Sequence, residues 1–77
     1  MPAEFIEADA KREAAALGEL LGDTRVRFHR RETPPESSEQ LMNLDREIRQ
    51  VLAQPLSTGL QLEIRGLTAR LRALDPR

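Results

Sequence analysis

The stretch Leu60–Leu74, LQLEIRGLTARLRAL, decides the fold because two kinds of secondary structure compete for it. Its beginning, read from Gly59 as GLQLEIRG, alternates apolar and polar residues between two glycines, which is typical of a β-strand. The whole stretch instead repeats apolar residues at intervals of four, three, four and three, at Leu60, Ile64, Leu67, Leu71 and Leu74. A helix explains all of these positions across Gly66, so the sequence predicts a helix over residues 57–74.

Two earlier segments repeat this helical spacing. In the first, apolar residues lie three or four positions apart, at Ile6, Ala10, Ala14, Leu17 and Leu21. In the second, the intervals are three, four and three, at Leu41, Leu44, Ile48 and Val51. These patterns predict helices over residues 3–21 and 37–54, the second of which ends before Pro55.

Two start signals compete ahead of the helix predicted over residues 37–54. TPPE, residues 33–36, combines a cap, two prolines and a capping-box acid, while SSEQ, residues 37–40, offers a similar box slightly later. Because a residue before proline avoids helical backbone angles, we favour the later start. In the same way, Ser57 or Thr58 can cap the last helix.

Between the first two helices lies Gly22–Ser38, GDTRVRFHRRETPPESS, which gathers four arginines and the single histidine. Gly22 is a typical helix stop, and Asp23 or Thr24 can cap a new helix. A strand here would lack a partner strand in an otherwise helical chain. We therefore predict a short bridging helix over residues 24–31.

Together these segments predict an all-α fold in a single domain spanning residues 1–77. We expect an antiparallel helical hairpin or three-helix bundle with coiled-coil-like seams and the short bridging helix, which inserts Phe28 into the core. A chain of 77 residues buries a modest fraction of its surface, and this one has two Phe and no Trp or Tyr to fill a core. Burial against a second copy would add stability, so the composition favours a homodimer or higher oligomer.

The composition also excludes several kinds of site. No cysteine is present, which excludes disulfides and thiolate-held zinc or iron–sulfur centres, and the lone His29 has no second histidine or cysteine with which to bind a metal. We therefore expect no cofactor and no metal. No apolar run is long enough to cross a membrane, and the start of the chain is charged, so we expect a cytoplasmic protein without membrane association.

A second stripe of the helix predicted over residues 57–74 is the main candidate for an interaction surface. It lies roughly opposite the leucine seam and consists of Leu62, Gly66, Ala69 and Ala73. Small residues there would let another backbone approach closely. Three apolar residues off the main seams are expected at the same interface, namely Leu20, Met42 and Leu52. The alternative is that the glycine and alanines only fill a solvated face.

The arginines of the connecting stretch are candidates for contact with an anionic partner. They are Arg25, Arg27, Arg30 and Arg31. Guanidinium groups bind phosphate through two hydrogen bonds, but a helix would spread these four around its axis. The nearby aromatic residue, Phe28, is expected in the core, which leaves none to stack on bases. The net charge of −1 also gives no bulk attraction to nucleic acid. We therefore favour solvated side chains that pair with the acidic blocks of the chain, and a surface position for His29.

Two parts of the chain resemble the YlbF/YmcA family of small bacterial helical proteins. AKREAAALGELLGDTRVRFHRRE, residues 10–32, is similar to the first helix of that family, and QPLSTGLQLEIRGLTARLRAL, residues 54–74, is similar to its closing leucine-rich helix. The resemblance implies an antiparallel, oligomerising regulatory adaptor, in some members part of a complex that influences RNA processing, competence and biofilm formation. Members of that family are usually longer, and the cysteines of those that hold iron–sulfur clusters are absent here, so no cluster-binding role carries over.

These observations predict a non-enzymatic helical adaptor that acts through protein–protein contacts, with a second copy of itself or with another protein. One alternative is a small all-helical enzyme of the chorismate mutase type, because LMNLDREIRQVL, residues 41–52, resembles helices of those enzymes. That alternative requires arginines that converge in a buried polar pocket. The other alternative is a nucleic-acid-binding module, which requires the charges of Arg25–Arg31 to share a face with Arg65, Arg70 and Arg72.

Overall fold

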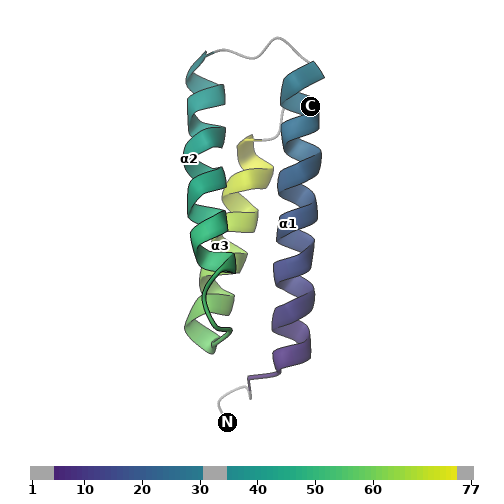
Figure 1. Cartoon of the computed structure of the whole chain (residues 1–77), viewed down its shortest axis with the longest axis vertical. Helices are drawn as coiled ribbons and strands as arrows, with labels where there is room; N and C mark the ends of the chain where they lie inside the picture. The colour runs from purple at the N-terminus through teal and green to yellow at the C-terminus, as the bar shows by residue number, and fades with distance from the viewer. Residues whose placement is uncertain (1–4, 31–34, 75–77) are drawn as a thin grey trace.

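The computed structural model describes residues 5–30 and 35–74, which form three helices: α1 (Glu7–Arg30), α2 (Pro35–Leu52) and α3 (Thr58–Leu74). The chain runs up, down and up, so that α2 lies antiparallel to its two neighbours and α1 lies parallel to α3 (Figure 1). No strand occurs in the described ranges. The predicted all-α three-helix bundle is thus confirmed, and Leu60–Leu74 is helical.

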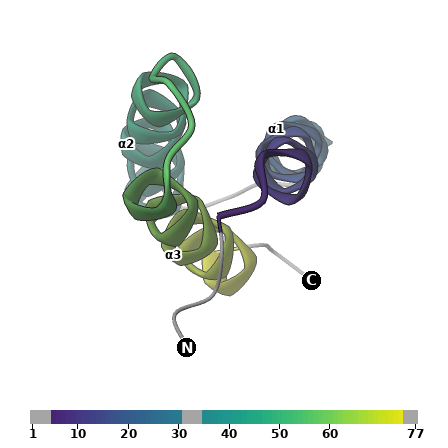
Figure 2. The same ribbon diagram turned by 90° about the horizontal axis from the view of Figure 1, so that it is seen from below.

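α3 is the central element of the bundle. It packs against both α1 and α2, whereas these two contact each other less extensively. Seen along the bundle in Figure 2, α3 lies below α1 and α2, which stand apart on the side away from it. The side of the bundle between α1 and α2 is therefore more open than the sides that α3 closes.

The core consists of one seam from each helix. α1 contributes Ala10, Leu17, Leu21, Thr24 and Phe28; α2 contributes Leu41, Leu44, Ile48 and Val51; α3 contributes Leu60, Ile64, Leu67 and Leu71. Those of α2 and α3 are the positions that the helical period predicts, and Phe28 is inserted as expected. Leu74 is half-buried at the edge of the core rather than inside it.

The predicted short bridging helix is wrong, because α1 continues through Gly22 to Arg30 without a break. No glycine of the described chain has a positive φ, so Gly22 does not adopt the left-handed conformation of a helix stop. The apolar seam explains why the helix continues: Leu21, Thr24 and Phe28 extend its three-and-four spacing, and their burial outweighs a glycine cost of about 1 kcal/mol. Thr24 is a core residue and not a cap.

The ends of α1 and α2 also differ from the prediction. α1 begins at Glu7 and not at residue 3, so that Ile6 precedes the helix and is exposed, although it was expected on the buried seam. α2 begins at Pro35, which corrects the favoured start at residue 37. Proline fits the first position of a helix, because an N–H at that position would have no partner within the helix. A residue before a proline avoids helical backbone angles, but the residues that this restricts precede Pro35 and lie outside α2.

The other boundaries follow the chemistry of Pro55 and Ser57. α2 ends at Leu52, two residues before the predicted end, and the Gln54 amide donates to the carbonyl of Val51 (3.1 Å) in a tighter turn. Ser57 caps α3, because its Oγ accepts a hydrogen bond from the amide of Leu60 (3.1 Å).

None of the described helices is long and apolar enough to cross a membrane.

Candidate interaction surfaces

The largest exposed apolar side chains gather in two places, and the first lies where α1 and α3 begin. Phe5, Ile6 and Leu62 line one shallow groove there, together with polar side chains of both helices. Leu62 is 61% exposed although it lies in the first turns of a helix whose other face is buried. We call these three residues the basal cluster. It is the largest group of exposed apolar side chains that the described chain brings together.

The outer face of α3 continues from the basal cluster along the bundle. Gly66, Ala69 and Ala73 are exposed on it, each three or four residues further on. A Cβ added to Gly66 would meet no other atom within 4 Å, so nothing in the single chain requires a glycine at this position. This face, Leu62 to Ala73, is thus exposed and lacks bulky side chains beyond Leu62.

Polar contacts flank this outer face and tie α3 to its neighbours. Glu13 of α1 accepts hydrogen bonds from Nε2 of Gln61 (2.6 Å) and Nε of Arg65 (2.9 Å). On the other side, Arg70 contacts Glu47 of α2 at 2.8 Å. The hydrogen bonds from Gln61 and then from Arg65 lower the pKa of the Glu13 carboxyl, because they favour its charged form. These contacts fix the orientation of α3 and hence of its outer face.

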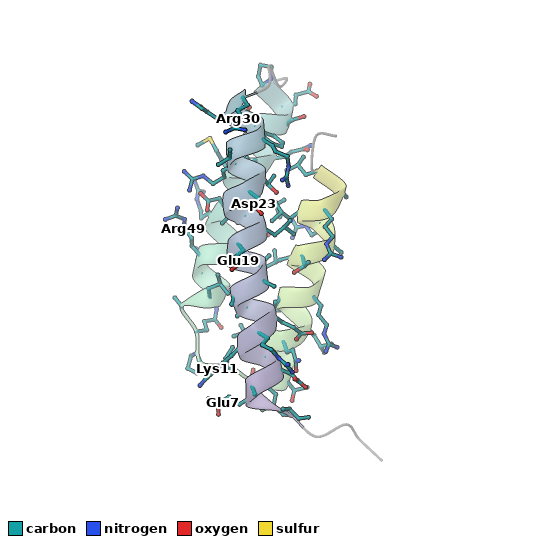
Figure 3. The ribbon with its side chains drawn as sticks, turned by 90° about the vertical axis from the view of Figure 1, so that its right-hand side faces the viewer. Glu7, Lys11, Glu19, Asp23, Arg30 and Arg49 are labelled. Atoms are coloured by element: carbon teal, nitrogen blue, oxygen red, sulfur yellow. The ribbon has the colours of Figure 1, made fainter. Side chains whose placement is uncertain are left out.

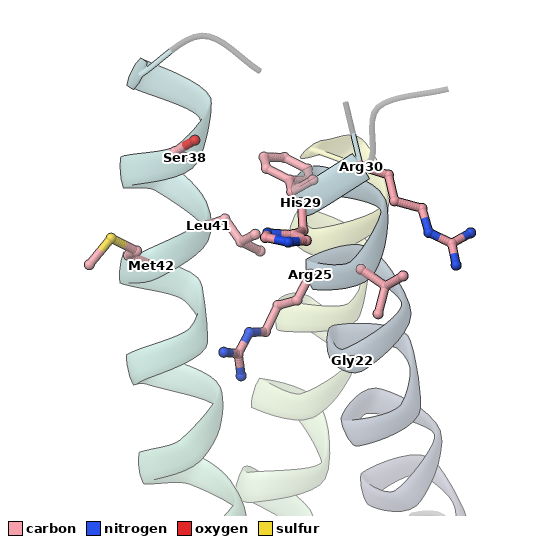
Figure 4. A pocket seen from close by; sticks show the side chains of 9 residues that line it. Gly22, Arg25, His29, Arg30, Ser38, Leu41 and Met42 are labelled. Atoms are coloured by element: carbon pink, nitrogen blue, oxygen red, sulfur yellow. The ribbon is translucent and has the colours of Figure 1, made fainter. Parts of the chain in front are cut away.

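The second group of exposed apolar side chains lies at the opposite end of the bundle, on its open side. A groove of about 800 Å³ runs there between the last turns of α1 and the first turns of α2. It is lined by Gly22, Arg25, Val26, Phe28, His29, Arg30, Ser38, Leu41 and Met42. Val26 is 51% exposed and Met42 is 65% exposed. We call this the α1–α2 groove (Figure 4).

The predicted arginine patch separates into unlike positions in the structure. Arg25 and His29 extend into the space between the two helices in Figure 4, whereas Arg30 points away from α2. Arg27 is half-buried and donates a hydrogen bond to Oγ1 of the buried Thr24 (3.4 Å). Arg31 lies outside the described residues. The three described arginines, Arg25, Arg27 and Arg30, therefore do not form one face, and the basic last turn of α1 suits the negative end of the helix dipole.

Acidic side chains occupy the outward face of α1. Glu7, Glu19 and Asp23 are directed away from the bundle in Figure 3, and Lys11 among them pairs with Glu7 at 3.3 Å. In the other direction Arg25 approaches Asp45 of α2 at 4.0 Å. The pair agrees with the expectation that these arginines meet acidic blocks of the chain, although a pair this exposed adds little stability.

The remaining predicted interface residues do not join one surface. Leu20 is half-buried against the core, Leu52 is exposed at the end of α2, and Met42 lies in the α1–α2 groove, far along the bundle from Leu62. Sequence analysis missed Phe5 and Val26 as exposed residues. Phe5 could have been noticed as an apolar residue ahead of the seam, whereas Val26 gave no signal because its segment was assigned to a separate helix.

The described residues contain no buried polar pocket of the kind that the chorismate mutase alternative requires. Every described arginine is exposed except the half-buried Arg27, and Thr24 is the only buried polar side chain in these ranges. No group of His, Asp and Glu in the described ranges could hold a metal ion. What this geometry offers chemically is apolar contact area with charged edges, at the basal cluster and at the α1–α2 groove.

Comparison with known proteins adds no relative: no family model, no curated protein and no solved structure matches the chain. The resemblance to the YlbF/YmcA family stays a prediction.

Proposed function

We propose that this protein is a non-enzymatic helical interaction module that assembles with a second copy of itself through the outer face of α3. The observation that carries the proposal is the basal cluster of Phe5, Ile6 and Leu62, which continues into a face without bulky side chains. A regulatory adaptor role in the cytoplasm, expected from the sequence, belongs to the same proposal.

The physical argument starts from burial. Leu62 and Ile6 are both more than half exposed, and exposed apolar side chains that gather beside a helix face are typical of contact sites. The face from Leu62 to Ala73 is about 16 Å long at the rise of an α-helix. Antiparallel pairing of two such faces would let the backbones approach at Gly66 and Ala69, while the leucines pack at either end.

Gly66 adds a second argument. A glycine inside a helix costs about 1 kcal/mol relative to alanine, and no neighbour within the chain fills the space where its Cβ would lie. A close helix–helix contact would supply a reason for a residue without a side chain here. The interface would be isologous, because the same face is used by both copies.

The oligomeric state tests the proposal directly. Sedimentation equilibrium at micromolar concentration should give twice the chain mass of 8.7 kDa for the parent protein. Leu62→Glu should give a monomer, because the carboxylate would be buried without a partner in the interface. A parent protein that sediments as a monomer of 8.7 kDa contradicts the proposal.

Met42→Glu provides the matched control. Met42 is 65% exposed and Leu62 is 61% exposed, so both substitutions place the same charge at equally open positions on helices. Only Leu62 lies on the proposed interface, so Met42→Glu should remain dimeric. Equal loss of the dimer in both variants would assign the effect to net charge and not to the face of α3.

A further inference from the structure

We infer that the α1–α2 groove is a docking site for an acidic amphipathic helix of a partner protein. The inference rests on surfaces at the other end of the bundle from the basal cluster, so it does not depend on self-association.

The floor and walls of the groove are apolar. Phe28 and Leu41 each remain 8% exposed, among the most exposed side chains of the core, and both line this groove. Val26 of α1 and Met42 of α2 are largely exposed beside them. A helix that lays apolar residues between α1 and α2 would cover Phe28 and Leu41, which is the common helix-in-groove mode of recognition. Met42 extends from the side of α2 away from α1 in Figure 4, so it lies at the border of the groove.

Charge distinguishes this groove from two others on the same bundle, although a third groove, between α2 and the end of α3, likewise contains an arginine, Arg70, and no acid among the described residues. Among the described residues its charged or ionisable lining consists of Arg25, His29 and Arg30, without an acid, and of these Arg25 and His29 extend between the helices in Figure 4. By contrast, the groove of the basal cluster contains an acid and a base, Asp9 and Arg65. The groove along Gly66 contains two glutamates and one arginine. An occupant of the α1–α2 groove is therefore selected for acidic side chains.

Arg25 is not neutralised by its one acidic neighbour. It lies 4.0 Å from Oδ2 of Asp45, whereas Arg49 donates to Oδ1 of the same carboxylate at 2.9 Å. Asp45 is thus held mainly by Arg49, and the Arg25 guanidinium, 54% exposed and extended between the helices, can bind a carboxylate of the partner. The first turn of α2 is the positive end of its dipole and lies near the groove, although Glu36 in the same turn offsets part of this potential.

The open side of the bundle provides room for an added helix. α3 covers the other side of α1 and α2, and these two contact each other less than either contacts α3. An added helix would lie in the groove of about 800 Å³ between the last turns of α1 and the first turns of α2. The occupant is a partner protein and not a second copy. The outward face of α1 carries acids but exposes one large apolar side chain, Val26, so the described part of a second copy offers no acidic helix with an apolar stripe.

A synthetic peptide tests the inference. The probe is a peptide of about 18 residues, about 27 Å as a helix, of leucine, alanine and glutamate with leucines three and four positions apart. Its control has lysine in place of every glutamate. In titrations followed by amide resonances of the full chain, the acidic peptide should shift residues 22–30 and 38–42, and the basic peptide should not.

Variants then assign the binding. Val26→Glu should weaken the acidic peptide about tenfold or more, because it places an unpaired carboxylate in an apolar wall. Arg25→Gln should weaken it several-fold and reduce its salt dependence. Arg46→Gln, an exposed arginine of α2 outside the groove, is the matched control and should bind as the parent does. Leu62→Glu should also bind normally, which separates this inference from the proposed dimer.

Three outcomes overturn the inference. The acidic peptide causes no shifts at about 1 mM, or both peptides bind equally. The groove resonances shift with protein concentration alone, which would make a second copy the occupant. A short DNA duplex displaces the acidic peptide and loses affinity in Arg25→Gln, which would make the groove a nucleic-acid site.

Discussion

The two faces of α3 have the same helical period and opposite environments. The inner face, from Leu60 through Ile64 to Leu71, is buried between α1 and α2, while the outer face, from Leu62 to Ala73, is exposed. Large branched side chains on the inner face fill volume, and small side chains on the outer face leave it open. The difference shows that periodicity identifies both faces of a helix, whereas only the contacts show which one still lacks a partner.

The largest expected difference between the faces is in stability. Ile64→Ala should lower the free energy of unfolding by about 2–4 kcal/mol, because it leaves a cavity in a packed core. Leu62→Ala should change it by less than about 0.5 kcal/mol when measured at low protein concentration, where no dimer contributes. Urea unfolding followed by circular dichroism measures both. Equal losses would show that the assignment of inner and outer faces is wrong.

The second largest effect on stability should come from the cap of α3, because it holds the start of the helix and with it both faces. Ser57→Ala removes the hydrogen bond to the amide of Leu60 and should cost about 1 kcal/mol in the same urea experiment. Thr58→Ala is the control, because it lies one residue further along and leaves the hydrogen bond to Ser57 in place. It should lower the free energy of unfolding less than Ser57→Ala does. If the two variants unfold alike, the cap does not hold the start of α3.

Gly66→Ala should separate stability from assembly. A Cβ here meets no atom within the chain, so the variant should gain about 0.5–1 kcal/mol of stability as a monomer. The same Cβ would keep a second backbone away, so the dimer should weaken in sedimentation equilibrium. Gly18→Ala on α1 should give a similar gain without weakening the dimer. A Gly66→Ala dimer as tight as the parent's would mean that the outer face makes no close contact.

The smallest effect should come from Glu13, at the border between the two faces. Hydrogen bonds from Gln61 and Arg65 lower its pKa in the folded state, so the unfolded chain binds the proton more tightly. The resulting stability is complete above the ordinary pKa of 4.5 and is lost as the pH falls through the lowered folded value. The difference in unfolding free energy between the parent and Glu13→Gln should therefore shrink on acidification. Gln61→Ala should remove part of the same pH dependence. If the difference in unfolding free energy between the parent and Glu13→Gln does not change with pH, the prediction is wrong.

Much of the fold could be predicted because burial repeats with the helical period. The seams of α2 and α3 follow directly from their leucine, isoleucine and valine spacing. Gly22 shows where local rules fail: its propensity predicts a stop, but Thr24 and Phe28 continue the seam and their packing decides the conformation. Pro35 shows that local rules also fail at a helix boundary. Two valid start signals for α2 lie only a few residues apart, and the favoured one was wrong.

The candidate surfaces were harder to predict from sequence. The outer face of α3 was visible as a stripe, because it lies on one helix. The α1–α2 groove was not, since Val26 and Met42 are brought together by the docking of two helices and share no sequence pattern. Ile6 was placed on the wrong face because the seam was extended beyond the start of α1, where the helical period no longer applies.

The parallel arrangement of α1 and α3 has a consequence for biosynthesis. The contacts of Glu13 with Gln61 and Arg65 join residues 48 and 52 positions apart, so α1 waits for its main partner until α3 has left the ribosome. Until then the seam of Leu17, Leu21 and Phe28 has only α2 to cover it, and α2 contacts α1 least. Until then α1 is a helix with an exposed apolar seam that a chaperone could bind, and closure of the bundle is coupled to the release of α3 from the ribosome.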